Sequence, residues 1–171
     1  MSKRLINLEH KIVSWQVASQ MRGIWKLKSQ KVAFTNGCFD ILHLGHISYL
    51  AQAASRADKL IVGINSDASI KQLQKGPDRP INDQHARSMV LAALSFVDAV
   101  VVFEQNTPFE LISQLNPDIL LKGADYNAAQ NDPQAKDLIV GSEHVKSYGG
   151  IIETIPFVDG YSTTAIFSKR K

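Results

Sequence analysis

The sequence predicts an α/β domain in which helices cover both faces of a doubly wound, five-stranded parallel sheet. Continuous apolar runs of strand length alternate along the chain with segments of helical periodicity, as in sheets that are buried on both faces. At 171 residues, 44% of them hydrophobic, the chain can fill one core. Cys38 is the only cysteine, so no internal disulfide framework is expected and a reducing, cytoplasmic location is favoured.

The expected elements follow one another in a regular order. Before the first strand, Ser14 is expected to cap an amphipathic helix through Leu27. Strands are expected at residues 31–34, 59–64, 99–103, 119–121 and 151–155. Helices are expected at residues 47–57, 82–94 with Asn82 as N-cap, 108–115 with Thr107 as cap and Pro108 in the first position, and 135–148. Residues 1–30 are interpreted as an N-terminal helical extension, packed on the domain at 31–171 or on the partner subunit of a possible homodimer.

The segment Thr-Asn-Gly-Cys-Phe-Asp-Ile-Leu-His-Leu-Gly-His, at residues 35–46, lies where the first strand is followed by a helix. At such a junction, free N–H groups and the positive end of the helix dipole attract phosphate. His43 and His46 are placed to bind phosphates there and to stabilise charge that develops on them during transfer. A metal pair is the alternative, but it needs further ligands, and the remaining histidines are only His10, His85 and His144.

Polar and basic residues follow the second strand. Asn65 and Asp67 come directly after it, and a loop at residues 71–82 carries Lys75 and Arg79. Lysine as a point charge and arginine as a planar fork suit a mobile clamp over phosphates, although an ordinary basic surface loop has the same composition. Arg87 lies one turn into the next helix, where it reaches the same cleft or is a solvated helix residue.

Two more loops at strand ends have features of a ligand site. After the fourth strand, Gly123 permits close backbone approach, and Asp125 or Tyr126 can meet a base or sugar, although a plain turn would look the same. After the fifth strand, hydroxyl side chains open a short terminal helix, where they either converge on an anion or simply cap the helix. These hydroxyl residues are Ser162, Thr163 and Thr164.

Residues 35–46 resemble the T-x-G-x-F-D-x-x-H-x-G-H signature of the cytidylyltransferase-like nucleotidyltransferase superfamily. The positions that match are Thr35, Gly37, Phe39, Asp40, His43, Gly45 and His46. The runs at 75–82, 121–126 and 160–166 resemble its D-glycero-β-D-manno-heptose 1-phosphate adenylyltransferase branch, which exists alone or as the C-terminal half of a bifunctional heptose kinase/adenylyltransferase. The resemblance covers about residues 11–167, and the chain departs from it at 127–136 and at Tyr161.

This resemblance implies a Rossmann-like nucleotidyltransferase fold over residues 31–171. It implies that AMP moves from ATP to the heptose 1-phosphate by direct in-line attack, giving ADP-heptose and pyrophosphate for lipopolysaccharide core or another heptose-bearing glycan. Mg²⁺ would bridge phosphate oxygens mainly through water, without a protein cage. Because a chain of this length holds no kinase domain, a separate heptose kinase is expected to supply the sugar 1-phosphate.

The resemblance also assigns roles to residues. The catalytic group is His43, His46 and Lys75. The nucleotide site is Thr35, Asn36, Gly37, Phe39, Asp40, Gly45, Lys122, Gly123, Asp125, Tyr126, Ser162, Thr163 and Thr164. The clamp on the sugar phosphate is Asn65, Asp67, Arg79 and Arg87. Asp40 has two interpretations of equal weight, since it either orients a histidine or water or caps the helix.

Other functions remain as alternatives. A CTP-dependent cytidylyltransferase acting on glycerol 3-phosphate shares the first motif, and so would a nucleotide-binding regulatory module without catalysis. A class I aminoacyl-tRNA synthetase is disfavoured, because the chain has no room for an anticodon-binding region and its net charge is only +3. Neither nucleic acid nor a membrane is an expected partner, since no basic face with stacking aromatics and no bilayer-spanning apolar run occurs.

Overall fold

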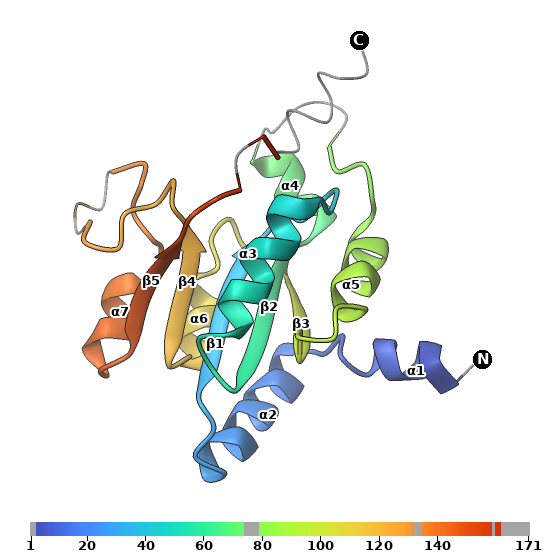
Figure 1. Cartoon of the computed structure of the whole chain (residues 1–171), viewed down its shortest axis with the longest axis horizontal. Coiled ribbons are helices and arrows are strands. Elements are labelled where there is room, and N and C mark those ends of the chain that lie inside the picture. Colours follow the sequence, from blue (N-terminus) through green and yellow to red (C-terminus); the bar gives the residue numbers. More distant parts are fainter. Residues whose placement is uncertain (1–2, 74–78, 131, 133–134, 159, 162–171) are drawn as a thin grey trace.

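The computed structural model describes residues 3–73, 79–130, 132, 135–158 and 160–161. Five strands form one sheet in the order β3-β2-β1-β4-β5, and every neighbouring pair is parallel (Figure 1). Their bounds are β1 Val32–Gly37, β2 Lys59–Asn65, β3 Ala99–Phe103, β4 Ile119–Gly123 and β5 Ile151–Ile155. The chain leaves β1 towards β2 and β3, then returns past β1 to β4 and β5. This reversal of direction confirms the predicted doubly wound fold.

Helices cover both faces of the sheet (Figure 1). On one face, Leu50 and Leu91 belong to a core with Ala33, and on the other, Leu111 and Val145 belong to a core with Phe34. Adjacent β1 residues thus enter opposite cores, as strand geometry requires. The helices are α1 Lys3–Glu9, α2 Trp15–Leu27, α3 Leu44–Ala54, α4 Asp67–Gln72, α5 Gln84–Ala92, α6 Phe109–Leu115 and α7 Ser142–Ser147. None of the helices in the described part of the chain is long and apolar enough to cross a membrane.

The helix predicted from Ser14 to Leu27 forms as α2. Ser14 is its N-cap, and the Ser14 hydroxyl accepts a hydrogen bond from the Val17 amide at 3.3 Å. Ala18 and Trp25 of α2 are buried in the same core as Phe34. The helix therefore packs on the sheet, which is one of the two expected placements. The division of the chain at residue 30 stays a prediction.

Several helix bounds differ from expectation. The helix predicted at 135–148 is wrong, because α7 begins only at Ser142. Gly141 precedes it with φ 86°, a left-handed conformation that ends any continuous helix there. The helix predicted at 47–57 begins earlier, at Leu44, and α5 is capped by Asp83 instead of Asn82.

Two further local predictions were incomplete. The predicted Thr107 cap of α6 is wrong, because Pro108 occupies the N-cap position and no side chain caps the helix. The helices α1 and α4 were not predicted, and α4 occupies residues assigned in part to a loop. Short helices of six or seven residues leave little periodicity to detect in a sequence.

Candidate active site

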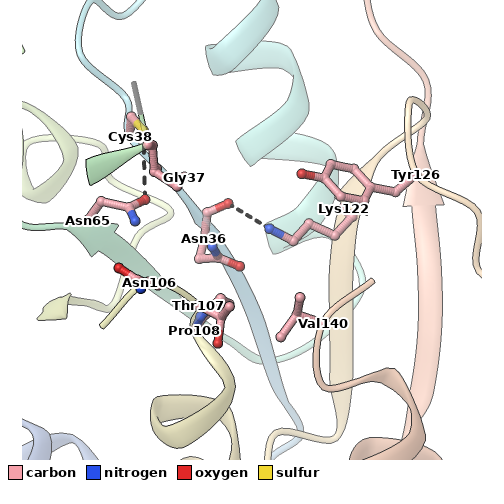
Figure 2. A pocket seen from close by; sticks show the side chains of 11 residues that line it. Asn36, Gly37, Cys38, Asn65, Asn106, Thr107, Pro108, Lys122, Tyr126 and Val140 are labelled. Carbon is pink, nitrogen blue, oxygen red and sulfur yellow. Dashed lines mark hydrogen bonds between the residues drawn. The ribbon is translucent and has the colours of Figure 1, made fainter. Parts of the chain in front are cut away.

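The carboxyl ends of the strands surround a cavity of about 240 Å³ (Figure 2). It lies beside β1, where the strand order reverses and where ligands collect in open parallel sheets. Its lining comes from the ends of β1, β2 and β4, from the loop after β3, and from isolated residues nearby. These residues are Asn36, Gly37, Cys38, Asn65, Leu73, Asn106, Thr107, Pro108, Lys122, Tyr126 and Val140.

Among the described residues that line this cavity, Lys122 is the one charged side chain. It is buried, its Nζ donates to the Asn36 carbonyl at 3.2 Å, and it lies 5.2 Å from the centroid of the Tyr126 ring (Figure 2). Burial raises the pKa of Tyr126, and the charge of Asp125 adds to this effect, so the phenol stays neutral. The Asn36 Oδ1 atom is buried without a hydrogen-bond partner among the described residues. Such a cavity suits an anionic ligand that also carries hydroxyl groups.

The two histidines of the signature lie at the start of α3. His43 is the N-cap, and its Nδ1 accepts a hydrogen bond from the His46 amide at 3.4 Å. Because Nδ1 is an acceptor, the proton of a neutral His43 resides on Nε2. The two rings stack with centroids 3.9 Å apart, and the Phe39 ring meets His46 edge-on at 5.2 Å. The sequence therefore holds both imidazoles in one fixed arrangement.

Two glycines of the signature allow this close packing. A Cβ on Gly45 would lie 3.1 Å from the His43 ring and from the Tyr161 carbonyl oxygen. A Cβ on Gly37 would lie 3.1 Å from the Phe39 ring. Since Gly37 lines the cavity and Phe39 contacts His46, this segment connects the cavity to the histidine pair.

Both imidazoles are neutral at pH 7 in the free protein. Burial, reinforced by the charge of His43, lowers the pKa of His46 to about 4, and a hydrogen bond with the Ile41 backbone opposes this only in part. Burial also lowers the pKa of His43. A neutral imidazole has one N–H to donate. His43 can therefore offer its Nε2–H to a phosphate oxygen without carrying a positive charge, whereas His46 would exchange its hydrogen bond with the Ile41 backbone for one to a phosphate.

The half-buried His46 makes the free energy of unfolding depend on pH. Its pKa is about 4 in the folded state and 6.5 in an unperturbed histidine, so the unfolded state binds the proton first as the pH falls. The contribution of the neutral His46 to the free energy of unfolding is complete above pH 6.5 and is lost as the pH falls towards 4. Urea unfolding across this interval should show a steeper loss of unfolding free energy for the wild type than for His46→Gln. The carboxylates titrate equally in both proteins, so the difference between the two curves reports on His46 alone. The same pH dependence of the unfolding free energy in both proteins would contradict a neutral, half-buried imidazole at His46.

The contacts of Asp40 are with neither a histidine nor the start of α3, and its expected role in orienting a water stays a prediction. Its buried carboxylate accepts hydrogen bonds from the amides of Ile81 at 2.9 Å and Asn82 at 3.0 Å, and lies 3.5 Å from the Arg79 guanidinium. In addition, the Asn82 side chain donates to the Asp40 carbonyl. Asp40 therefore fastens the signature segment to the end of the loop that precedes α5, and it contacts neither a histidine nor the start of α3.

Arg87 also differs from its predicted role as a clamp. Its guanidinium is fully buried and donates to the Cys38 carbonyl, the Asn82 carbonyl and the Asp67 carboxylate. It is neither solvated nor directed into the cavity. A structural contact between loops fits this geometry better than contact with a sugar phosphate.

The remaining predicted residues divide into three groups. Thr35 is buried with its hydroxyl 2.6 Å from the Tyr49 hydroxyl, so only its backbone is left for a ligand. Gly123 is buried, and a Cβ there would collide with the Phe157 ring, whereas Asp125 is exposed. Lys75, Ser162, Thr163 and Thr164 lie outside the described residues.

Sequence reasoning missed part of the cavity wall. Five residues that line it had not been predicted, namely Leu73, Asn106, Thr107, Pro108 and Val140. A usable signal existed for Asn106 and Thr107, because they follow the end of β3 as the predicted residues follow β1, β2 and β4. Thr107 had been interpreted only as a helix cap.

The residues that the structure describes contain no group of three or more His, Cys, Asp or Glu side chains placed to hold a metal ion. Asp40, the carboxylate of the signature, already accepts two backbone hydrogen bonds.

Comparison with known proteins agrees with this picture. Two curated relatives are each called bifunctional protein HldE. The one from Mesorhizobium japonicum is 52% identical over 152 residues, which make up 89% of this chain and 29% of the relative. The one from Magnetococcus marinus is 47% identical over 159 residues, or 93% of this chain and 31% of the relative. The chain thus spans about a third of the length of these relatives.

Two solved structures share the fold. A lipopolysaccharide core biosynthesis protein from Thermoplasma volcanium is 23% identical with a TM-score of 0.57, covering 78% of this chain and 99% of that one. A pantoate-beta-alanine ligase from Francisella tularensis is 19% identical with a TM-score of 0.57, covering 85% and 66%. The family model described as Cytidylyltransferase-like matches residues 34–169. This chain therefore belongs to the cytidylyltransferase-like family.

Proposed function

We propose that this chain transfers AMP from ATP to D-glycero-β-D-manno-heptose 1-phosphate, giving ADP-heptose and pyrophosphate. The observation that carries the proposal is a cavity whose described lining has one cation among neutral amide and hydroxyl groups, joined through Gly37 and Phe39 to the histidine pair. This distribution of charged and uncharged polar groups suits a phosphorylated sugar. The identity of about 50% to proteins called bifunctional protein HldE supports the same assignment, as do the sequence runs that resemble the heptose branch.

The acceptor would occupy the cavity. Asn65, Asn106 and Thr107 offer donors and acceptors to sugar hydroxyls, while Lys122 neutralises the 1-phosphate. Lys122 was predicted to border the adenosine, but its place among these groups favours the acceptor phosphate. ATP would then lie on the side of His43 and His46, with its phosphates at the start of α3.

The chemistry needs little from the protein beyond placement. An oxygen of the sugar 1-phosphate attacks the α-phosphorus of ATP in line, a new P–O bond forms, and the bond to the pyrophosphate oxygen breaks. The attacking oxygen is already anionic, so no general base is required. His43 and His46 would donate hydrogen bonds to phosphate oxygens as charge shifts to the leaving group. Mg²⁺ bound with ATP would neutralise the phosphate charge.

The other predicted groups remain part of this proposal. Lys75 and Arg79 would close over the phosphates, and Ser162, Thr163 and Thr164 would bind the β- and γ-phosphates. The acceptor requires a heptose kinase, which we propose as the partner activity in a cytoplasmic pathway. A homodimer is proposed through α2, which exposes Val17, Ile24 and Leu27. Neither nucleic acid nor a membrane enters the proposal.

Pyrophosphate release should identify the substrates. We expect release with ATP and D-glycero-β-D-manno-heptose 1-phosphate together, and little with CTP or glycerol 3-phosphate. The reason is that the cavity offers several uncharged polar groups, which glycerol 3-phosphate would leave partly unpaired. Preferred release with CTP and glycerol 3-phosphate would establish the cytidylyltransferase alternative. Binding of ATP without release for any pair of substrates would indicate a regulatory module instead.

A further inference from the structure

An arginine is buried behind the wall of the cavity. Arg87 of α5 is only 2% exposed, although its guanidinium is charged at any ordinary pH. All three nitrogens donate hydrogen bonds, Nε to the Asn82 carbonyl at 3.0 Å, Nη1 to the Cys38 carbonyl at 2.7 Å and Nη2 to the Asp67 carboxylate at 2.7 Å. A buried charge that is this fully bonded resists any movement of its partners.

Two of these partners lead directly to the cavity. Cys38 lines it, and Asp67 begins α4 two residues after Asn65, which also lines it (Figure 2). On the cavity side, the Cys38 thiol and the Asn65 Oδ1 are 3.7 Å apart. Arg87 therefore holds the ends of β1 and β2 together from behind, at the point where their side chains face a ligand.

The segment that Arg87 holds is strained. Phe39 follows Cys38 with φ 47°, a left-handed conformation that is costly for a bulky residue. Such a conformation persists only when its surroundings determine it. Arg87 fixes the carbonyl before Phe39, and Asp40 fixes the backbone after it through the amides of Ile81 and Asn82.

We propose that Arg87 is a positioning residue of the active site. It keeps Cys38 against Asn65 and keeps Phe39 in the conformation in which its ring contacts His46. It thereby fixes the acceptor cavity relative to the histidine pair without touching a substrate. Only its effect on turnover rests on the proposed function, since its effect on the protein itself can be measured without substrate.

Cys38 provides a direct probe because it is the only cysteine of the chain. The test compares the rate at which 5,5′-dithiobis(2-nitrobenzoate) modifies Cys38 in the wild type, in Arg87→Lys and in Arg22→Ala. An ammonium group keeps the charge but cannot reach three carbonyl and carboxylate acceptors as a planar guanidinium does. Cys38 is only partly exposed at the cavity wall, so loosening of its segment should increase access to the thiol, and we expect Arg87→Lys to react about ten-fold faster than wild type.

Arg22→Ala is the matched control. Arg22 of α2 also pairs with a carboxylate, Asp118 at 3.0 Å, and also donates to a backbone carbonyl, that of Asn116. None of these residues lines the cavity. Arg22→Ala should lower the unfolding midpoint while it leaves the reactivity of Cys38 and the turnover unchanged.

Turnover supplies the second measurement. Arg87→Lys should lower kcat/KM for the heptose 1-phosphate about ten-fold, because misplacement of a substrate by a fraction of an ångström is costly. Wild-type Cys38 reactivity in Arg87→Lys, or equal changes in Arg22→Ala, would overturn the proposal. A wild type that binds ATP but gives no turnover would refute the proposed function instead, and the thiol rates would still decide the role of Arg87.

Discussion

His46→Ala is expected to lower kcat for pyrophosphate release on the order of 10²- to 10³-fold, as removal of a fixed hydrogen-bond donor at a reacting centre does. The affinity for ATP should change far less, because the start of α3 and the other phosphate contacts remain. The pKa of about 4 makes His46 an uncharged donor near pH 7. Its contribution is therefore a directed hydrogen bond to charge that grows in the transition state.

His144→Ala is a suitable control for the loss of a packed imidazole. His144 of α7 also meets two aromatic rings edge-on, those of Phe109 and Tyr148, and its Nε2 lies 2.8 Å from the Asn116 Oδ1. It does not line the cavity. Single-turnover rates and ATP titrations on both variants separate chemistry from binding. Unchanged turnover in His46→Ala would contradict the catalytic assignment, as would an equal loss in His144→Ala.

The features that could be predicted from the sequence are those that depend on neighbouring residues. Buried parallel strands produce continuous apolar runs, so the predicted bounds of the strands lie close to those of the structure. The Ser14 cap and the position of the histidines at a helix start are also local, since each involves residues three apart. The helix at 135–148 was wrong because Leu138 pairs with Asn127 in an isolated β-bridge and because the left-handed Gly141 separates that segment from α7.

Features that depend on distant contacts could not be predicted in this way. Arg87 lies 49 residues from Cys38, whose carbonyl it binds, and helical spacing alone suggested a solvated or ligand-binding residue. Asp40 is likewise bound by amides more than 40 residues away. The contribution of Val140 to the cavity depends on how the segment after β4 folds back, which no local pattern specifies.

Lys122→Met is expected to lower kcat/KM for the heptose 1-phosphate on the order of 10²-fold, equivalent to the loss of one strong charged hydrogen bond. Methionine fills similar space beside Tyr126, so the fold should be retained. The variant cannot neutralise an anion, however, and the part of the lining that the structure describes holds no second charged side chain to replace Lys122. The KM for ATP should change little, because the nucleotide phosphates lie at the histidine pair in the proposed arrangement.

Lys59→Met is the matched control for the loss of a lysine beside an aromatic ring. Which KM rises in Lys122→Met, that for ATP or that for the acceptor, shows which substrate Lys122 binds. Lys59 also places its ammonium near an aromatic ring, 5.8 Å from the Trp25 centroid, and pairs with Asp98 at 2.8 Å. It begins β2, at the opposite end of the strand from Asn65. Its replacement should affect stability alone. If Lys122→Met instead raised the KM for ATP and spared the acceptor, Lys122 would border the nucleotide, and the cavity would have to hold part of ATP.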